Sequence, residues 1–252
     1  MDQNPKLSRI EENRVLGARI RLLQPERGYR AGLDAALLAA SCDAAPGDRV
    51  FEAGCGVGGA LLAAAARRPQ ARFVGVERDP EALALVRRNI ELNGLKDQVH
   101  AEPGDVAAGF RKLGLEPFDL AMANPPFFDD PGALRGPAPE REGAYLADAG
   151  LEAWCALLSK AVREGGRVTM IHRADRLADI LASLTPKCGS FRIRGIHPYA
   201  DQPAKRVLVR AVKTGKAPLL LLPPLVLHDR SGAKHTPEAE AILRGEAEIG
   251  WE

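Results

Sequence analysis

A glycine-rich turn between an apolar run and an alanine-rich segment is the feature that most constrains how this chain can fold. Residues 49–52 (RVFE) have the composition of a buried strand, and residues 59–68 (GALLAAAARR) that of a helix. Between them stand Gly54, Gly56 and Gly58, where the backbone must turn tightly and can approach a ligand closely. The turn predicts an α/β fold with a ligand site at the end of the first strand.

Strands and helices alternate along the rest of the chain. Further strands are predicted at residues 72–77, 98–101, 118–123 and 167–172. Helices are predicted between Asp79 and Gly94, where the residue types fit an N-cap and a C-terminal cap, and at residues 151–162 and 175–184. Two late strands, 191–196 and 206–212, have no clear helix between them. We therefore expect a mostly parallel sheet of seven strands that ends in an antiparallel hairpin.

Charge is distributed unevenly along the sequence. The chain is 46% hydrophobic and 27% charged, which is ordinary for a globular protein, and its net charge is only +2. Residues 160–216, however, hold 13 Lys and Arg against four Asp and Glu, whereas residues 31–159 hold 12 against 19. A basic region suits a polyanion such as RNA, because bound phosphates release condensed counterions; a solvated basic face is the alternative.

Features that the sequence lacks disfavour several kinds of protein. The four cysteines are scattered without a C-x-x-C pair, so neither a zinc site nor a disulfide framework is expected. No apolar run approaches the roughly 20 residues that cross a membrane, and the first residues lack the apolar core of a secretory signal. We expect a cytoplasmic protein without a metal and without a membrane partner.

Acidic residues around the glycine-rich turn indicate which ligand it holds. Glu77 ends the second strand 23 residues after Gly54, and a carboxylate at this spacing can accept hydrogen bonds from ribose hydroxyls. NAD and S-adenosylmethionine (SAM) share that ribose, so the turn leaves a methyltransferase, a dehydrogenase and a structural turn open. Glu52 would repel a pyrophosphate but suits the cationic methionyl end of SAM. Asp105 follows the third strand, where a loop would meet the adenine.

The tetrapeptide Asn124-Pro125-Pro126-Phe127 follows the strand at 118–123 and indicates the acceptor of the reaction. An exocyclic amine is a poor nucleophile, since its lone pair is delocalised into the attached π system. If the Asn124 side-chain oxygen and the Pro125 carbonyl each accept one N–H, the nitrogen can direct its lone pair at a methyl group. The two prolines restrict the backbone, and Phe127 can stack on a base. Together with SAM, the motif predicts a methyltransferase that acts on nitrogen.

With these motifs the chain resembles class I, Rossmann-like SAM-dependent methyltransferases that carry N-P-P-F or N-P-P-Y. More closely, it resembles the bacterial tRNA1(Val) adenine-N6 methyltransferases over nearly its whole length. The segment from Leu23 to Asp34 is similar to the stretch that contacts SAM ahead of the first strand in that family. The resemblance implies SAM as the cofactor, RNA and most closely tRNA as the partner, and adenine N6 as the acceptor.

The site residues follow from the motifs and the resemblance together. The expected catalytic residues are Asn124, Pro125 and Phe127. The expected cofactor-binding residues are Arg30, Gly32, Asp34, Glu52, Ala53, Gly54, Gly56, Gly58, Glu77, Arg78, Asp105 and Asn124. The expected loop at 128–146 can shape the target pocket through Asp129, Asp130, Arg135, Arg141 and Tyr145, although a solvated loop is the plainer alternative.

The expected organisation is a methyltransferase domain at residues 49–216, preceded by a segment, residues 1–48, that packs on its core. Residues 217–252 form a C-terminal tail. Lys205 and Arg206, just before the last strand, are candidate contacts to RNA phosphates, together with the basic N-terminal segment. The sequence leaves the oligomeric state open.

Other functions remain open on the sequence alone. A protein-glutamine N5 methyltransferase can carry the same tetrapeptide, because a side-chain amide poses the same electronic problem. Such enzymes usually have a helical domain ahead of the cofactor strand, and only 48 residues precede Arg49 here. A ribosomal RNA guanine-N2 methyltransferase is closer in chemistry. A catalytically silent RNA-binding module would not need Glu77, Asp105 and Asn124 together, and a dehydrogenase would need a hydride-transfer site that we do not find.

Overall fold

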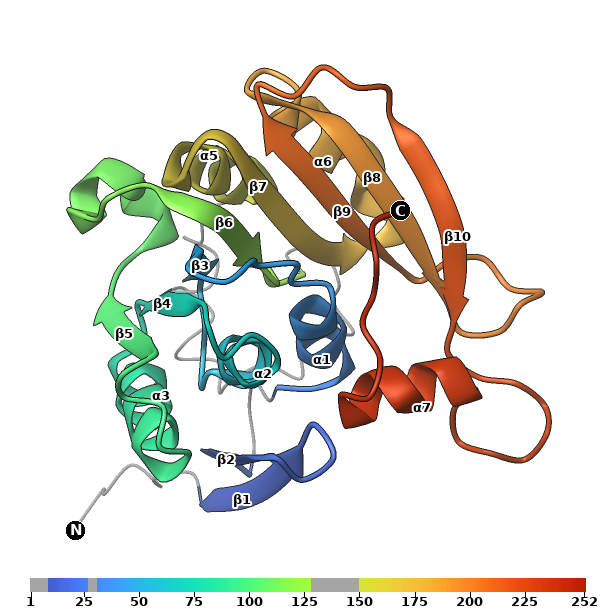
Figure 1. Ribbon diagram of the computed structural model, residues 1–252, viewed down its shortest axis with the longest axis horizontal. Coiled ribbons are helices and arrows are strands. Elements are labelled where there is room, and N and C mark those ends of the chain that lie inside the picture. Colours follow the sequence, from blue (N-terminus) through green and yellow to red (C-terminus); the bar gives the residue numbers. More distant parts are fainter. Residues whose placement is uncertain (1–8, 27–30, 128–149) are drawn as a thin grey trace, which may run out of the picture.

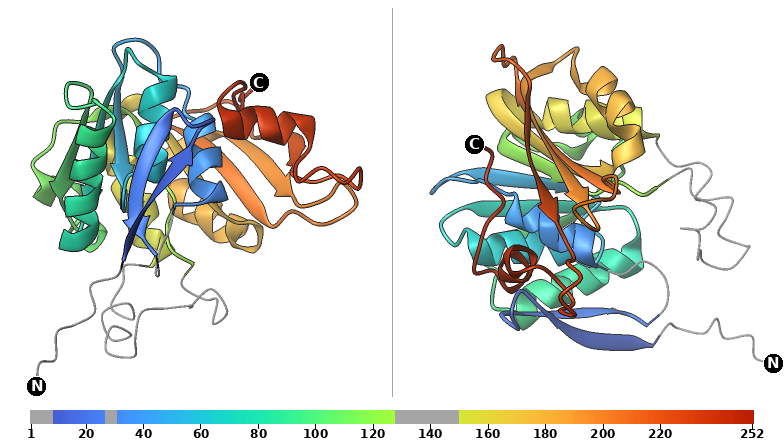
Figure 2. Two further views of the ribbon diagram at one scale, coloured as in Figure 1. Left: turned by 90° about the horizontal axis from the view of Figure 1, so that it is seen from below. Right: turned by 90° about the vertical axis from the view of Figure 1, so that its right-hand side faces the viewer.

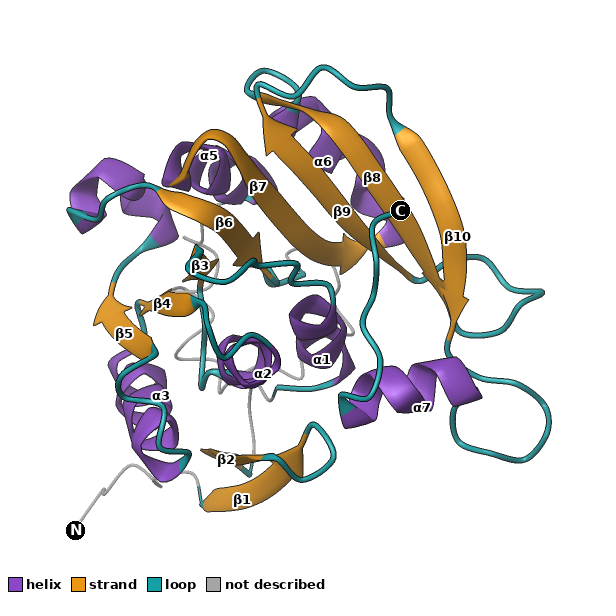
Figure 3. Cartoon of the chain, in the orientation of Figure 1, coloured by secondary structure: helices purple, strands orange, loops and turns teal. Residues whose placement is uncertain are grey.

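The computed structural model describes residues 9–26, 31–127 and 150–252, and an eight-stranded sheet forms its centre (Figures 1 and 3). Five neighbouring strands are parallel: β5 (Val99–Pro103), β4 (Arg72–Glu77), β3 (Arg49–Ala53), β6 (Phe118–Ala123) and β7 (Val162–Arg173). Next to β7 lies β9 (Arg206–Lys213), which is antiparallel to β7 and to β8 (Cys188–His197). The predicted α/β class, with its late antiparallel strands, is confirmed.

The expected strand count was one too low, because β10 (Leu220–Val226) adds an eighth strand beside β8. Its sequence, LLLPPLV, contains Pro223 and Pro224, which cannot donate to a ladder, and the pairing shifts register between Leu222 and Leu225. Proline is tolerated in this position because β10 is the edge strand of the sheet. The prolines hid the strand from a pattern-based prediction.

Helices cover both faces of the sheet, so the fold has three layers (Figure 2). One face carries α1 (Leu33–Ala40), α2 (Gly59–Arg67) and α3 (Pro80–Leu92). The other carries α5 (Leu151–Ala161), α6 (Leu177–Leu184) and the short 3-10 turns η1 (Val106–Ala108) and η2 (Phe110–Leu113). A further 3-10 turn, η4 (Ala174–Arg176), leads into α6, and α7 (Pro237–Arg244) packs against α1. The hydrophobic core forms two clusters, one on each face.

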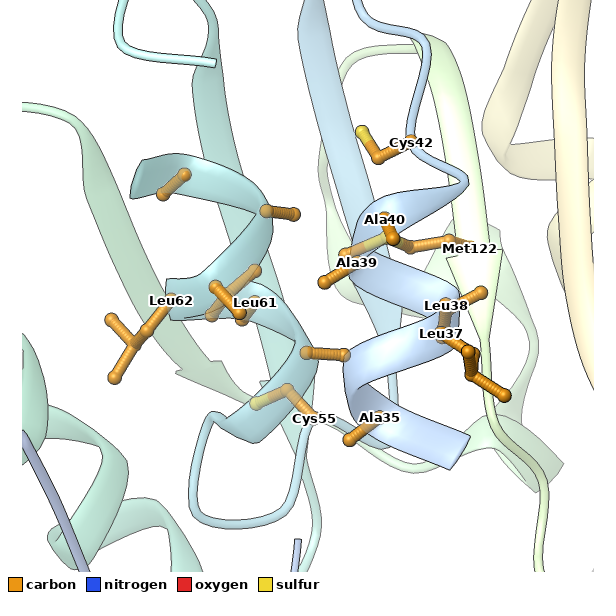
Figure 4. Close-up of a cluster of buried hydrophobic side chains, with 14 of the residues drawn as sticks. Ala35, Leu37, Leu38, Ala39, Ala40, Cys42, Cys55, Leu61, Leu62 and Met122 are labelled. Atoms are coloured by element: carbon orange, nitrogen blue, oxygen red, sulfur yellow. The ribbon is translucent and has the colours of Figure 1, made fainter. Parts of the chain in front are cut away.

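Small side chains set the packing of α1 on α2, beside the glycine-rich turn (Figure 4). Ala35 and Ala39 of α1 are buried with Leu61 and several alanines of α2. An added methyl group at Gly59 would lie 2.2 Å from the Cβ of Ala31, so the two segments approach as closely as a glycine allows. α1 was not predicted from the sequence, because its N-cap residue is Gly32, which has no capping side chain to indicate where a helix begins.

The predicted capping of α3 is confirmed. The Asp79 carboxylate accepts hydrogen bonds from the amides of Glu81 and Ala82, Pro80 occupies the first turn, and Gly94 beyond the C-terminus has φ +67°. The sequence also suggests that Gly165 and Gly166 close the helix predicted at 151–162, and this was wrong. They lie inside β7 as a bulge, where Phe118 pairs with Val162 and Leu120 with Arg167.

A two-stranded hairpin, β1 (Ile10–Val15) and β2 (Ile20–Pro25), packs on α3 ahead of the sheet. Its anchor is the fully buried Asn89, which accepts the Leu23 amide at 2.7 Å and donates to the carbonyls of Leu23 and Val57, each at 2.9 Å. Since Val57 belongs to the glycine-rich turn, this one side chain connects the N-terminal hairpin to the candidate cofactor site.

Candidate active site

The carboxyl ends of β3, β4 and β6 bring the two predicted motifs together. Ala53 pairs with Val76 on one side and with Ala123 on the other, so the residues that follow these strands leave the sheet at one edge. Those residues are Gly54, Glu77 and Asn124. Ligands of open α/β sheets bind at such an edge, outside the carboxyl ends of the strands. Glu52, Gly54 and Asn124 line one small cavity there, with Ala31 and Ala35 of the α1 region.

The glycine-rich turn needs glycine for conformational and steric reasons. Gly54, Gly56 and Gly58 have φ of +61°, +55° and +91°, in the left-handed region that side chains disfavour. At Gly54 a Cβ would also lie 2.4 Å from the ring of Trp154 on α5. The turn therefore packs closely against α5. Because the glycines carry no side chains, the backbone of the turn can approach a ligand directly.

Glu77 organises this turn. One carboxylate oxygen accepts the Gly56 amide at 2.9 Å, and the other accepts the Asp79 amide at 2.8 Å. A carboxylate has about four acceptor positions, so the capacity to accept ribose hydroxyls remains. The Glu77 carbonyl also accepts the Gly104 amide at 3.1 Å, which places the loop with Asp105 beside the same strand end. Asp105 itself caps η1 by accepting the Ala107 amide at 2.8 Å.

Glu52 is a buried carboxyl group whose hydrogen-bonding capacity is not fully satisfied. Its side chain is 3% exposed, and Oε2 has no hydrogen-bond partner among the described residues. Burial, and next the charge of Glu77, raise the pKa of Glu52 well above its ordinary value. A cation in the cavity would favour its ionised form, because it would supply the opposite charge that the protein does not. The chemistry of this carboxyl group thus suits the cationic methionyl end of SAM.

The acceptor motif stands beside this cavity. Asn124 is half-buried, Pro125 is buried and Phe127 is half-buried. The guanidinium of Arg206 lies over the Phe127 ring at 4.5 Å, and the His172 ring meets it edge-on at 5.2 Å with an interplanar angle of 86°. The guanidinium thereby covers one face of the aromatic ring.

Arg206 is fixed in turn by Asp34, whose carboxylate accepts its Nε–H at 2.9 Å. We call Asp34, Phe127, His172 and Arg206 the Phe127 clamp. Asp34 was predicted as a cofactor contact and Arg206 as a phosphate contact, whereas the structure pairs them with each other and with the aromatic ring. Lys205 is exposed, with no ion pair to a described residue.

His172 is the site residue that sequence reasoning missed. It is 2% exposed at the end of β7, and neither ring nitrogen has a well-formed hydrogen bond within the described part of the chain. Burial lowers the pKa of His172, as do the charges of Arg173 and Arg206; the Pro126 backbone offsets part of this. The available signal was its position as the last residue of a strand predicted to end at the ligand-binding edge.

The remaining predicted residues are placed as follows. Gly32 is the exposed N-cap of α1, Ala53 is fully buried at the end of β3, and Arg78 is exposed after β4. Arg30 lies outside the described residues, as do Asp129, Asp130, Arg135, Arg141 and Tyr145 of the expected loop. Within residues 9–26, 31–127 and 150–252 we find no cluster of metal-ligating side chains. No helix in the same ranges is long and apolar enough to cross a membrane.

Known proteins are similar to this chain over much of its length. The model of the methyltransferase small domain matches residues 30–134. A tRNA1(Val) (adenine(37)-N6)-methyltransferase of Porphyromonas gingivalis is 30% identical over 187 residues, which cover 71% of this chain and 72% of that protein. A release factor glutamine methyltransferase of Geobacter sulfurreducens is 37% identical, but over only 40% of this chain and 34% of its own length.

Solved structures of methyltransferases are also similar to this chain. The crystal structure of a predicted O-methyltransferase, protein Atu636 of Agrobacterium tumefaciens, has a TM-score of 0.71 and 28% identity, covering 86% of this chain and 98% of that one. A SAM-dependent O-methyltransferase of Thermotoga maritima shares the fold, with a TM-score of 0.53 and 17% identity over 77% of this chain and 69% of its own.

The fold, the glycine-rich turn at the ligand-binding edge and these similarities define a SAM-dependent methyltransferase. Within this class the chain belongs to the family that includes the P. gingivalis tRNA1(Val) (adenine(37)-N6)-methyltransferase. When bound, SAM supplies a methyl group made electrophilic by the adjacent sulfonium.

Proposed function

We propose that this protein methylates the exocyclic N6 nitrogen of an adenine in tRNA. The observation that carries the proposal is the shared cavity, because Asn124 of the acceptor motif and Glu52 of the cofactor site line the same small space. A methyl donor held by its cationic end at Glu52 would thus lie within reach of an amine held at Asn124. The reducing cytoplasm is the proposed location, since all four cysteines are buried and unpaired.

The chemistry assigned to the motif requires hydrogen-bond acceptors rather than a strong base. The Asn124 Oδ1 and the Pro125 carbonyl would each accept one N–H of the amine, which leaves its lone pair directed at the methyl group. The consecutive prolines hold these acceptors before the substrate arrives. Once the nitrogen is methylated and positively charged, its proton is acidic enough to pass to solvent.

The cofactor contacts are proposed from the same geometry. Glu77 would accept the ribose hydroxyls while it holds the turn, and Asp105 would face the adenine of SAM. The proposed contacts from the turn are Ala53, Gly54, Gly56 and Gly58; Arg30, Gly32, Asp34 and Arg78 complete the set expected from the family resemblance.

A nucleobase is favoured over a glutamine side chain by the Phe127 clamp. Arg206 lies over one face of the Phe127 ring and His172 contacts the ring in a T-shaped arrangement, so the ring is held in place in the acceptor motif. A base has a wide aromatic face to stack on such a ring, a contact worth about 1–3 kcal/mol, whereas the small amide plane of a glutamine side chain offers far less stacking area. The similarity to the glutamine methyltransferases also covers only about a third of the length of those proteins.

The relatives suggest the position in the RNA, adenine 37 of tRNA1(Val). A direct test uses tRNA1(Val) purified from bacterial cells in two forms, one with adenosine and one with guanosine at position 37. We expect methyl transfer from labelled SAM to the first form only. Equal labelling of both forms would move the target to another nucleotide. Labelling of neither, with label in a release factor instead, would favour the glutamine methyltransferase.

A further inference from the structure

The basic charge of residues 160–216 divides into two groups. Seven of its 13 Lys and Arg side chains have an acidic partner: Arg163, Arg167, Arg173, Arg176, Arg206, Arg210 and Lys213. Arg192 and Arg194 donate to backbone carbonyls instead. The four remaining cations are all lysines: Lys160, Lys187, Lys205 and Lys216. Each is exposed and none has an ion pair with a described residue.

Three of these four lysines line one hollow, although they are far apart in the sequence. Lys160 comes from the end of α5, Lys187 from the loop after α6, and Lys216 from the loop after β9. Arg111 of η2 and the half-buried Lys213 line it too, and Glu164 is the one acid among its described lining residues. The hollow encloses about 710 Å³. Cations that converge in this way repel one another, and an anion between them would remove that cost.

We propose that this basic hollow binds phosphates of the RNA backbone. The hollow is lined by residues at the end of β9 and the start of β8. Figure 1 shows these strand ends at the opposite end of the sheet from the ends of β6 and β7. It is thus a second contact surface, separate from the site where the base would react. This inference rests on the proposed RNA substrate.

The residue types favour a polyphosphate chain over one small anion. A small anion is usually recognised by backbone amides or by the planar fork of arginine, which fix its orientation. Apart from the one guanidinium of Arg111, the cations of this hollow are ammonium groups on flexible stems, which act as point charges. Point charges along an open surface bind a phosphodiester backbone without reading its sequence.

The distance to the reaction site suits a folded RNA. β7 runs from Glu164 in the hollow to His172 beside Phe127, and eight residues of strand extend roughly 25 Å. An RNA stem is long enough to reach from one place to the other, since a single RNA-binding module can follow about 16 base pairs. An isolated nucleoside or a short oligonucleotide would not reach both.

The test compares two charge-matched triple variants by RNA binding over a range of salt. In the hollow variant, Lys160, Lys187 and Lys216 become Gln; in the control, the exposed Arg88, Lys96 and Lys234 become Gln. For the hollow variant, we expect the slope of the logarithm of the tRNA association constant against the logarithm of salt concentration to become shallower by roughly 2–3. Its tRNA affinity at 0.1 M salt should fall about tenfold or more. The control should retain the wild-type slope, and both variants should bind SAM and melt as wild type.

Equal slopes for the hollow variant and the wild type would overturn the proposal. A variant that loses binding of sodium tripolyphosphate but keeps its tRNA affinity would overturn it as well, since the hollow would then take a small polyphosphate. Wild-type protein that binds no RNA at any salt concentration would contradict the proposed function itself. The two failures are therefore distinguishable.

Discussion

At the scale of single residues, Asn124 carries the chemistry and its substitution should separate catalysis from cofactor binding. We predict that Asn124→Ala lowers kcat by at least about a hundredfold, the usual order for removal of one preorganised hydrogen-bonding group. SAM affinity, measured by calorimetry, should stay within a few-fold, because Glu52 and Glu77 remain. A variant with normal kcat would remove Asn124 from the mechanism.

Glu52 should couple SAM binding to pH. Burial raises the pKa of this carboxyl in the protein without SAM, whereas a bound cation favours the carboxylate. The complex then binds fewer protons than the free protein. SAM affinity should consequently rise with pH from the ordinary carboxyl pKa up to the raised one. Calorimetry in buffers with different ionisation enthalpies should register proton release.

The control for this prediction is Glu52→Gln, which cannot ionise and should bind SAM more weakly without releasing a proton. Stability follows the same linkage. A carboxyl with a raised pKa in the folded state destabilises the fold as pH rises above its unfolded value, so cofactor-free wild type should lose stability across that range. Identical pH profiles for wild type and Glu52→Gln would show that Glu52 stays in one protonation state.

The Phe127 clamp predicts that Asp34 and Arg206 act as a unit. Asp34→Asn and Arg206→Met should each lower kcat/KM for RNA by about tenfold at saturating SAM, because the stacking ring loses its support. The double variant should be no worse than the worse single variant, since both remove the same arrangement. Additive losses would mean that the two side chains work independently.

At the scale of elements, the turn after β3 depends on its packing against α5. Gly54→Ala adds a methyl group 2.4 Å from the Trp154 ring and places a side chain at φ +61°. We predict a loss of about 1–3 kcal/mol in the free energy of unfolding, measured by denaturant titration, together with weaker SAM binding. Gly94→Ala is the matched control: it also has a positive φ, but no atom lies within 4 Å of the added group. Equal effects would assign the loss to backbone strain alone.

The same elements show how far sequence reasoning reaches. Asp79, Pro80 and Gly94 carry local signals, so α3 was predicted with its ends. α1 and β10 lack such signals, since one has a glycine cap and the other two prolines, and both are held by tertiary contacts. Glu77 and Asn124 could be predicted because they end strands, whereas the ion pair of Asp34 with Arg206 joins residues 172 positions apart. No pattern in the sequence relates those two.

At the scale of the whole molecule, one sheet separates two tasks. Its carboxyl edge gathers the cofactor cavity, the acceptor motif and the Phe127 clamp, and its opposite end carries the basic hollow. Seven of the 13 basic side chains of residues 160–216 are in ion pairs with acidic residues, so net charge alone does not show which of them are available to RNA. The lysines that have no ion pair with a described residue are the informative subset.

The most direct measurement identifies the methylated nucleoside. Wild-type protein would be incubated with total bacterial tRNA and SAM carrying a labelled methyl group, and the RNA digested for nucleoside mass spectrometry. The account predicts label in N6-methyladenosine. Label in N2-methylguanosine, or unlabelled tRNA from a protein that demonstrably binds SAM, would contradict it.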